Sequence, residues 1–131
     1  MRRSPEEPAG DAHNRELPAG SSSLSSGSGV VVVTSTLPTR DDADRIARLL
    51  VEERLAACVQ CAGPIESTYR WQGQVERSTE WYVHCKTAAA RAEALLARLR
   101  ALHPYDVPEF IVTPVLGGNP AYLDWVKRES E

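Results

Sequence analysis

Two cysteines and two histidines are the residues of this chain whose types and spacing could bind a metal ion. Cys58 and Cys61 form a C-x-x-C within the segment LAACVQC, a spacing that occurs in metal sites and in redox pairs. His84 and His103 carry imidazole, a common metal ligand, and a third histidine, His13, lies in a polar N-terminal segment and is expected to be inert. The elements that hold these side chains decide which of them can act together.

The C-x-x-C lies in ACVQCAGPIESTYRW, an extended run over residues 57–71 that predicts a strand. Side chains alternate along a strand, so Cys58 and Cys61 should point to opposite faces and cannot together chelate one ion. A thioredoxin-type redox motif opens a helix, and no helix is predicted to begin here. We expect a structural role, with Cys58 as a small buried apolar residue.

His103 ends a predicted helix, LHPY being its last turn and exit. There an imidazole can bond the terminal carbonyls and is favoured by the helix dipole, and metal ligation is the alternative. His84 falls on the strand face opposite Trp81 and Val83 and is expected to be solvated or at an interface.

Composition excludes several classes of protein. The 131 residues are 42% hydrophobic and 25% charged, an ordinary globular composition, and no apolar run approaches the ~20 residues that span a bilayer. The net charge is −3 with no block of Lys and Arg, which argues against nucleic acid as the main partner. No membrane partner is expected either. Arg2 and Arg3 are followed by no hydrophobic stretch, so we expect a cytoplasmic protein with reduced thiols.

The chain divides into two parts. Residues 1–29 are rich in Ser, Gly and Pro and are predicted to be a disordered tail. Residues 30–131 carry the periodic patterns of one folded domain. The predicted elements are strands at 30–37, 57–71, 75–87 and 108–116, helices at about 38–57 and 87–103, and a short helix from Pro120. This order predicts an α+β fold, a ferredoxin-like (split βαβ) antiparallel sheet with two covering helices and a terminal helix.

Local signals mark the ends and breaks of these elements. Thr39 with Asp42 resembles a capping box, and Thr87 and Asn119 are the expected N-caps of the later helices. Gly63-Pro64 predicts a bulge, because proline cannot donate to a sheet ladder. The second and third strands exceed the usual ~5–6 residues. A hairpin of that length projects beyond a small domain, which suggests pairing with another subunit.

Several segments in sequence order resemble the CutA divalent-cation-tolerance family, over residues 30 to about 129. They are VVVTSTLP, RLAAC, STYRWQGQVE, KT, HPYDVPE and NPAYLDWV. The resemblance implies a ferredoxin-like protomer, a homotrimer whose hairpin arms pair across subunits, and a cytoplasmic protein linked to tolerance of copper and other divalent cations. It implies no catalytic activity, so the protein is not expected to be an enzyme.

The copper site attributed to the family is incomplete here. It uses a Cys after the first strand and two adjacent His before PY, and this sequence has Ser35 at the first position and Leu102-His103 at the others. A hydroxyl is a poor ligand for Cu(I) and Leu has no donor. His103 is therefore the expected ligand of a weak site for Cu²⁺ or another divalent cation, strengthened only if the three copies in a trimer converge.

A second candidate site is a cleft at a subunit boundary. Lys86 and Glu109 could pair across neighbouring strands, or line this cleft together with Tyr69, Trp71 and Tyr105. The alternative function is accordingly a small-ligand sensor or interaction scaffold without a metal role, similar to nitrogen-regulatory signalling trimers. Tyr and Trp are enriched at protein interfaces, so we expect the aromatic side chains to pack within the trimer. They are Tyr69, Trp71, Trp81, Tyr82, Tyr122 and Trp125.

Overall fold

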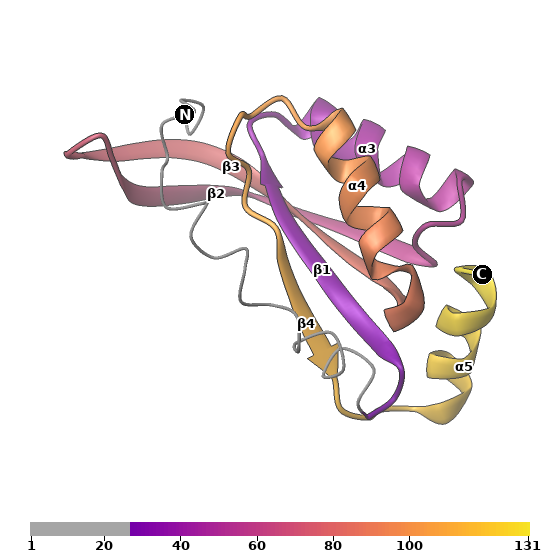
Figure 1. The fold of residues 1–131 in the computed structure, drawn as a ribbon. Helices are drawn as coiled ribbons and strands as arrows, with labels where there is room; N and C mark the ends of the chain where they lie inside the picture. Colours follow the sequence, from indigo (N-terminus) through magenta and orange to yellow (C-terminus); the bar gives the residue numbers. More distant parts are fainter. Residues whose placement is uncertain (1–26) are drawn as a thin grey trace.

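A computed structural model describes residues 27–131, so most of the predicted tail, residues 1–26, lies outside the described residues. The elements are β1 (Val30–Leu37), α3 (Arg40–Glu52), β2 (Cys58–Trp71), β3 (Gln74–Ala88), the 3₁₀ helix η2 (Ala89–Arg91), α4 (Ala92–Leu102), β4 (Ile111–Val115) and α5 (Pro120–Glu129). The four strands form one antiparallel sheet in the order β2-β3-β1-β4. Helices α3 and α4 lie side by side on one face of it (Figure 1). The predicted fold class is confirmed.

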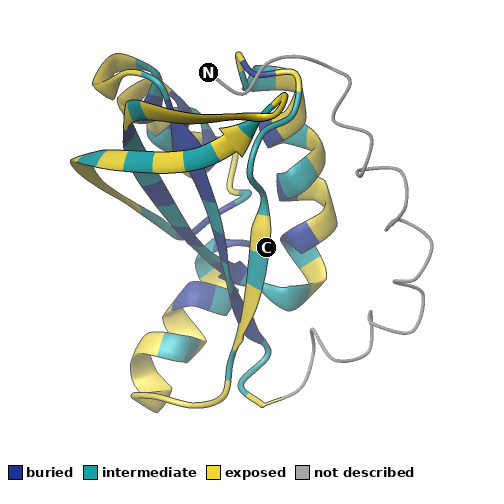
Figure 2. Cartoon of the chain, turned by 90° about the vertical axis from the view of Figure 1, so that its left-hand side faces the viewer, coloured by how far each residue is buried: buried dark blue, intermediate teal, exposed yellow. Residues whose placement is uncertain are grey.

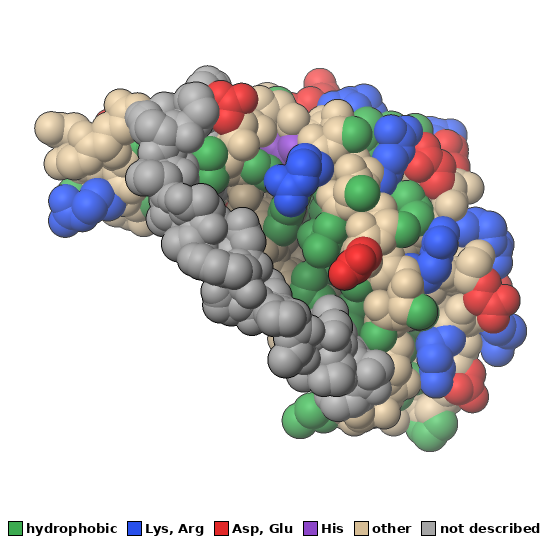
Figure 3. All heavy atoms as spheres, in the orientation of Figure 1, with side chains coloured by type: hydrophobic (Ala, Val, Ile, Leu, Met, Phe, Trp, Pro, Cys, Tyr) green, Lys and Arg blue, Asp and Glu red, His purple; other side chains and the backbone are tan. Residues whose placement is uncertain are grey.

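The core lies between the sheet and these two helices. Every second residue of β1 and β3 faces it, and the apolar stripes of α3 and α4 cover it, as their 3.6-residue periodicity predicts. The fully buried members are Val31, Val33, Leu37, Ala43, Ile46, Leu50, Val83, Cys85, Leu95 and Leu99. On the outer side of α3 and α4, Arg side chains alternate with Asp and Glu (Figure 3). Among them, Arg98 makes two 2.8 Å hydrogen bonds to Glu53 and so joins α4 to the end of α3.

The predicted helix caps are confirmed at two of three positions. The Thr39 hydroxyl accepts a 3.0 Å hydrogen bond from the Asp42 N–H, and Asn119 Oδ1 accepts from the Ala121 N–H at 3.1 Å. The prediction at Thr87 is wrong. Strand β3 continues through Ala88, and the Thr87 hydroxyl instead donates to the Leu55 carbonyl at 2.8 Å. Thr87 stays in the strand because it pairs with Val31 of β1, and an N-cap position would lose this pairing.

The β2–β3 hairpin extends well past the rest of the sheet (Figure 1). Strand β1 pairs with β3 only as far as Trp81, so residues 74–80 of β3 pair with β2 alone. Gln72 and Gly73 form the connecting turn with φ of 53° and 81°, the positive values that a two-residue type I′ turn requires. Exposed and half-buried residues alternate along this arm (Figure 2). A two-stranded ribbon is marginally stable in water, so the arm is suited to packing against another chain.

The predicted bulge lies at Gly63-Pro64, where the β2–β3 register shifts between Ala62 and Ile65. Gly63 is required by close packing, because a Cβ there would lie 2.5 Å from Cδ1 of Trp81. Proline also occurs in β4, and β4 is an edge strand that pairs only with β1, the position in a sheet that tolerates it.

Among residues 27–131, helix α5 covers the other face of the sheet at one end only. There α5 packs over the start of β1, where Val30, Ala57 and Val126 are buried together, and the Ser130 hydroxyl accepts from the Ala88 N–H at 3.1 Å. The uncovered middle is called the open face below. Its residues are Gln60, His84, Thr34 and Ile111 in one row across the strands and Lys86, Val32 and Thr113 in the next. Among residues 27–131, no helix combines the length and apolarity needed to cross a membrane.

Candidate metal and ligand sites

The two cysteines of the C-x-x-C point to opposite faces of the sheet, as predicted. Cys58 pairs with Lys86 and so faces outward, whereas Cys61 pairs with Val83, a core residue. The Cys61 thiol donates to the Ala43 carbonyl of α3, with an S···O distance of 3.7 Å. These two thiols therefore cannot bind one ion together.

The expectation that Cys58 is buried is wrong, because Cys58 is half-buried and Cys61 is exposed. The buried thiol is Cys85, at the centre of the core. Burial raises the pKa of Cys85 to about 12, since the low-polarity surroundings disfavour the thiolate. Cys85 is thus an apolar core residue and not a nucleophile or ligand.

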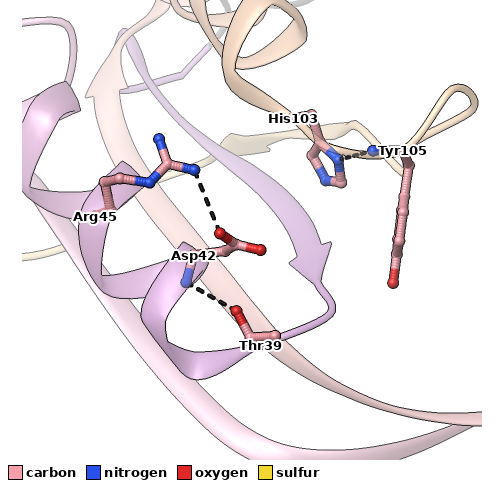
Figure 4. Close-up of polar contacts among 5 residues, drawn as sticks. All are labelled: Thr39, Asp42, Arg45, His103 and Tyr105. Atoms are coloured by element: carbon pink, nitrogen blue, oxygen red, sulfur yellow. Dashed lines mark hydrogen bonds and ion pairs between the residues drawn. The ribbon is translucent and has the colours of Figure 1, made fainter.

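Both ring nitrogens of His103 are engaged in hydrogen bonds within the chain. Nδ1 accepts a 3.1 Å bond from the Tyr105 N–H (Figure 4), and Nε2 lies 2.8 Å from the Thr36 carbonyl oxygen. A backbone N–H can only donate, so the ring proton is on Nε2 and is donated to Thr36. The ring also contacts the rings of Tyr105 and Phe110. A cation could reach His103 only by displacing one of these two bonds.

The other two positions at which the resemblance suggested copper ligands offer none. Ser35 is fully buried within β1, and Leu102 packs against the core. Within the described part of the chain, no group of three His, Cys, Asp or Glu side chains could hold a metal ion. Metal binding by His103 stays a prediction, and a single chain gives it no second ligand.

A buried carboxyl group, Glu80, was not anticipated from the sequence. Glu80 is 1% exposed, and its Oε2 accepts a 2.8 Å hydrogen bond from the Tyr105 hydroxyl. Its neighbours along β3 form the polar stretch ERSTE, which gives no sign of burial. The loop after α4 brings Tyr105 over it, and only that tertiary contact identifies the pair.

The residues predicted to line a cleft are not brought together within one chain. Tyr69 and Trp71 lie on the projecting arm, and Trp71 is 13 residues along β2 from the partner of Lys86, roughly 43 Å at the usual strand rise. Lys86 and Glu109 do not lie on neighbouring strands, because Glu109 precedes β4 and β1 lies between β3 and β4. Lys86 donates to Gln60 of β2 instead.

His84 lies at the middle of the open face, and its two ring nitrogens differ. Nδ1 is 3.3 Å from the Thr34 hydroxyl, and the ring stacks on Tyr82 with centroids 5.0 Å apart. No hydrogen bond from a described residue reaches Nε2. Thr34 and Tyr82 thus fix the ring and leave one nitrogen available.

Comparison with known proteins finds similarity to one family over most of the described residues. A family model described as CutA1 divalent ion tolerance protein matches residues 31–129. The Divalent-cation tolerance protein CutA of Thermus thermophilus is 44% identical over 99 residues, which are 76% of this chain and 96% of that protein. Protein CutA, chloroplastic, of Arabidopsis thaliana is 40% identical over 76% of this chain, and this match spans 55% of the plant protein.

Solved structures agree with the sequence comparison. CutA from the bacterium Xylella fastidiosa superimposes with a TM-score of 0.77 at 45% identity, over 79% of this chain and 99% of that one. The periplasmic divalent cation tolerance protein CutA from Archaeoglobus fulgidus gives a TM-score of 0.75 at 32% identity, over 78% and 99%.

Proposed function

Because the chain belongs to the CutA1 divalent ion tolerance protein family, we propose that it acts as a homotrimer in the tolerance of copper and other divalent cations, without catalysing a reaction. The family match over residues 31–129 carries this proposal. The relatives are named for tolerance and not for a reaction.

Two surfaces of the described domain support self-assembly. The arm carries exposed apolar side chains such as Val75, which is 66% exposed. The open face is also apolar in part: Val32 and Tyr82 are half-buried and Ile111 is 51% exposed. An antiparallel sheet that faces water usually presents polar side chains. β-Branched and aromatic residues on both surfaces favour burial against further copies of this chain.

The cation-binding role needs more than one subunit. His103 uses both ring nitrogens internally, Ser35 is buried, and the position before His103 is Leu102. One imidazole is a weak site by itself, whereas stable sites combine three or four ligands. A trimer supplies every ligand position three times.

A second candidate function is the binding of a small anion or metabolite, in a sensor or scaffold without a metal role. The Lys86 ammonium on the open face, positioned by Gln60, favours it. Thermal-shift screening separates the two candidates. Stabilisation by anionic metabolites and not by divalent cations would replace the metal role with this one.

The test of the proposed function uses cells and purified protein together. A strain that lacks this gene should grow less well in added Cu²⁺, and the intact gene should restore growth. Light scattering on the full chain should give three times the chain mass of 14.4 kDa. Unchanged copper sensitivity in the deletion strain would contradict the tolerance role. Fractionation of the same cells tests the predicted cytoplasmic location.

A further inference from the structure

Of the two histidines among residues 27–131, His84 has one ring nitrogen that no other described residue bonds. Its Nδ1 is held by Thr34 at 3.3 Å and its ring by stacking on Tyr82, while Nε2 has no hydrogen bond from a described residue. This is the arrangement of a metal-binding imidazole, in which a second-shell partner on one nitrogen orients the other toward the ion. His103 differs, because both of its nitrogens are already bonded.

The position of His84 in the sheet makes it a candidate for a shared site. It lies on β3, an inner strand of the order β2-β3-β1-β4, at the middle of the open face. If three copies turn their open faces toward a threefold axis, a residue at the middle of that face meets its own two symmetry mates. Residues near the edges, such as Ile111, would meet other residues instead.

We propose that the Nε2 atoms of three His84 side chains, one from each subunit, form a single site for a divalent cation that prefers imidazole, such as Zn²⁺ or Cu²⁺. This inference rests on the proposed trimer and names the site through which it would bind a cation. Three imidazoles with an open fourth position are a known zinc geometry, and imidazole also suits copper.

The positive charge of Lys86 on the same face should weaken cation binding, which gives a further test of the site. Lys86 lies two residues along β3 from His84, about 7 Å away at the usual strand rise, and its ammonium is held by Gln60. A positive charge at this distance weakens cation binding. Replacing Lys86 with Gln should therefore tighten it.

Calorimetric titration of Zn²⁺ into the full-length protein tests the site. Zn²⁺ is the probe because it has no redox chemistry with the three cysteines. Wild type should bind one ion per three chains. His84→Gln should weaken binding more than about tenfold and Thr34→Val by about tenfold, the usual effect of losing a second-shell partner. His103→Gln separates this site from the His103 ligand predicted from the sequence. Cys61→Ser, which removes the exposed thiol, is the matched control and should bind as wild type does.

Light scattering on each variant separates the two proposals. If all are trimers and His84→Gln binds Zn²⁺ like wild type, or if His103→Gln or Cys61→Ser abolishes binding, the His84 site is wrong and the trimer stands. A monomeric wild type overturns both. If His84→Gln is not a folded trimer, Lys86→Gln and Thr34→Val provide the test instead. The site is then wrong if both variants bind Zn²⁺ with the affinity of wild type.

Discussion

The Tyr105 hydroxyl donates a 2.8 Å hydrogen bond to the Glu80 carboxyl group across a sequence separation of 25 residues, and both side chains are buried. Glu80 lies where β3 leaves the four-stranded sheet and enters the arm, and Tyr105 comes from the loop after α4. The bond thus ties the base of the arm to the helical layer. It also links the arm to the loop that positions His103.

Tyr105→Phe should lower the free energy of unfolding by about 1–3 kcal/mol, because the buried Glu80 carboxyl group loses this hydrogen bond. Chemical denaturation measures the change. Tyr69→Phe is the matched control, since its hydroxyl contacts Ser78 at 3.3 Å on the arm, and it should cost less. Equal losses of stability from the two substitutions would show that the hydrogen bond to Glu80 stabilises the fold no more than the Tyr69 contact does.

Gly63→Ala should destabilise the domain. The added Cβ would lie 2.5 Å from Cδ1 of Trp81, so the indole ring or the bulge must shift, and such overpacking typically costs about 1–3 kcal/mol. Gly117→Ala is the control, because no heavy atom lies within 4 Å of a Cβ built there. Thermal unfolding with no difference between the two variants would contradict the close packing.

Thr39→Ala should cost about 1 kcal/mol of stability, since the Asp42 N–H loses the acceptor at the N-terminus of α3. Thr39→Ser should retain most of it, because the hydroxyl is kept. A Thr39→Ser variant as unstable as Thr39→Ala would show that the hydroxyl does not act as a cap.

Alkaline pH should destabilise the protein through Cys85. Its pKa is raised to about 12 in the folded state by burial, whereas an unfolded thiol ionises near 8.5. Between these values the unfolded state holds fewer protons than the folded state, so stability falls as pH rises, by at most about 1.4 kcal/mol per pH unit from this one group. The comparison is with Cys85→Val, which lacks the thiol. Identical slopes of stability against pH from 9 to 11 would contradict the assignment.

The fold could be predicted from the sequence because each element carries its own local signal. The β-branched run of β1, the 3.6-residue stripe of α3 and the Gln72-Gly73 turn depend on neighbours in the chain. The start of α4 was missed because Thr87 is held in the sheet by β1 and bonded to Leu55, both distant in sequence.

The candidate site was less predictable for the same reason. That His103 bonds to Thr36 and Tyr105, and that Thr34 holds His84, depend on strand register and on the loop after α4. The sequence indicated that Lys86 and Glu109 could lie on neighbouring strands, but Glu109 precedes β4, and β1 lies between β3 and β4. Residue types suggested the ligands, and tertiary contacts decided which nitrogen atoms are available.

Native mass spectrometry of the full-length protein with Zn²⁺ tests the central claim most directly, since it weighs the assembly and counts its ions together. The proposed function predicts one dominant species of three chains, each of 14.4 kDa, that retains a divalent cation. A spectrum of single 14.4 kDa chains without bound cation would contradict it.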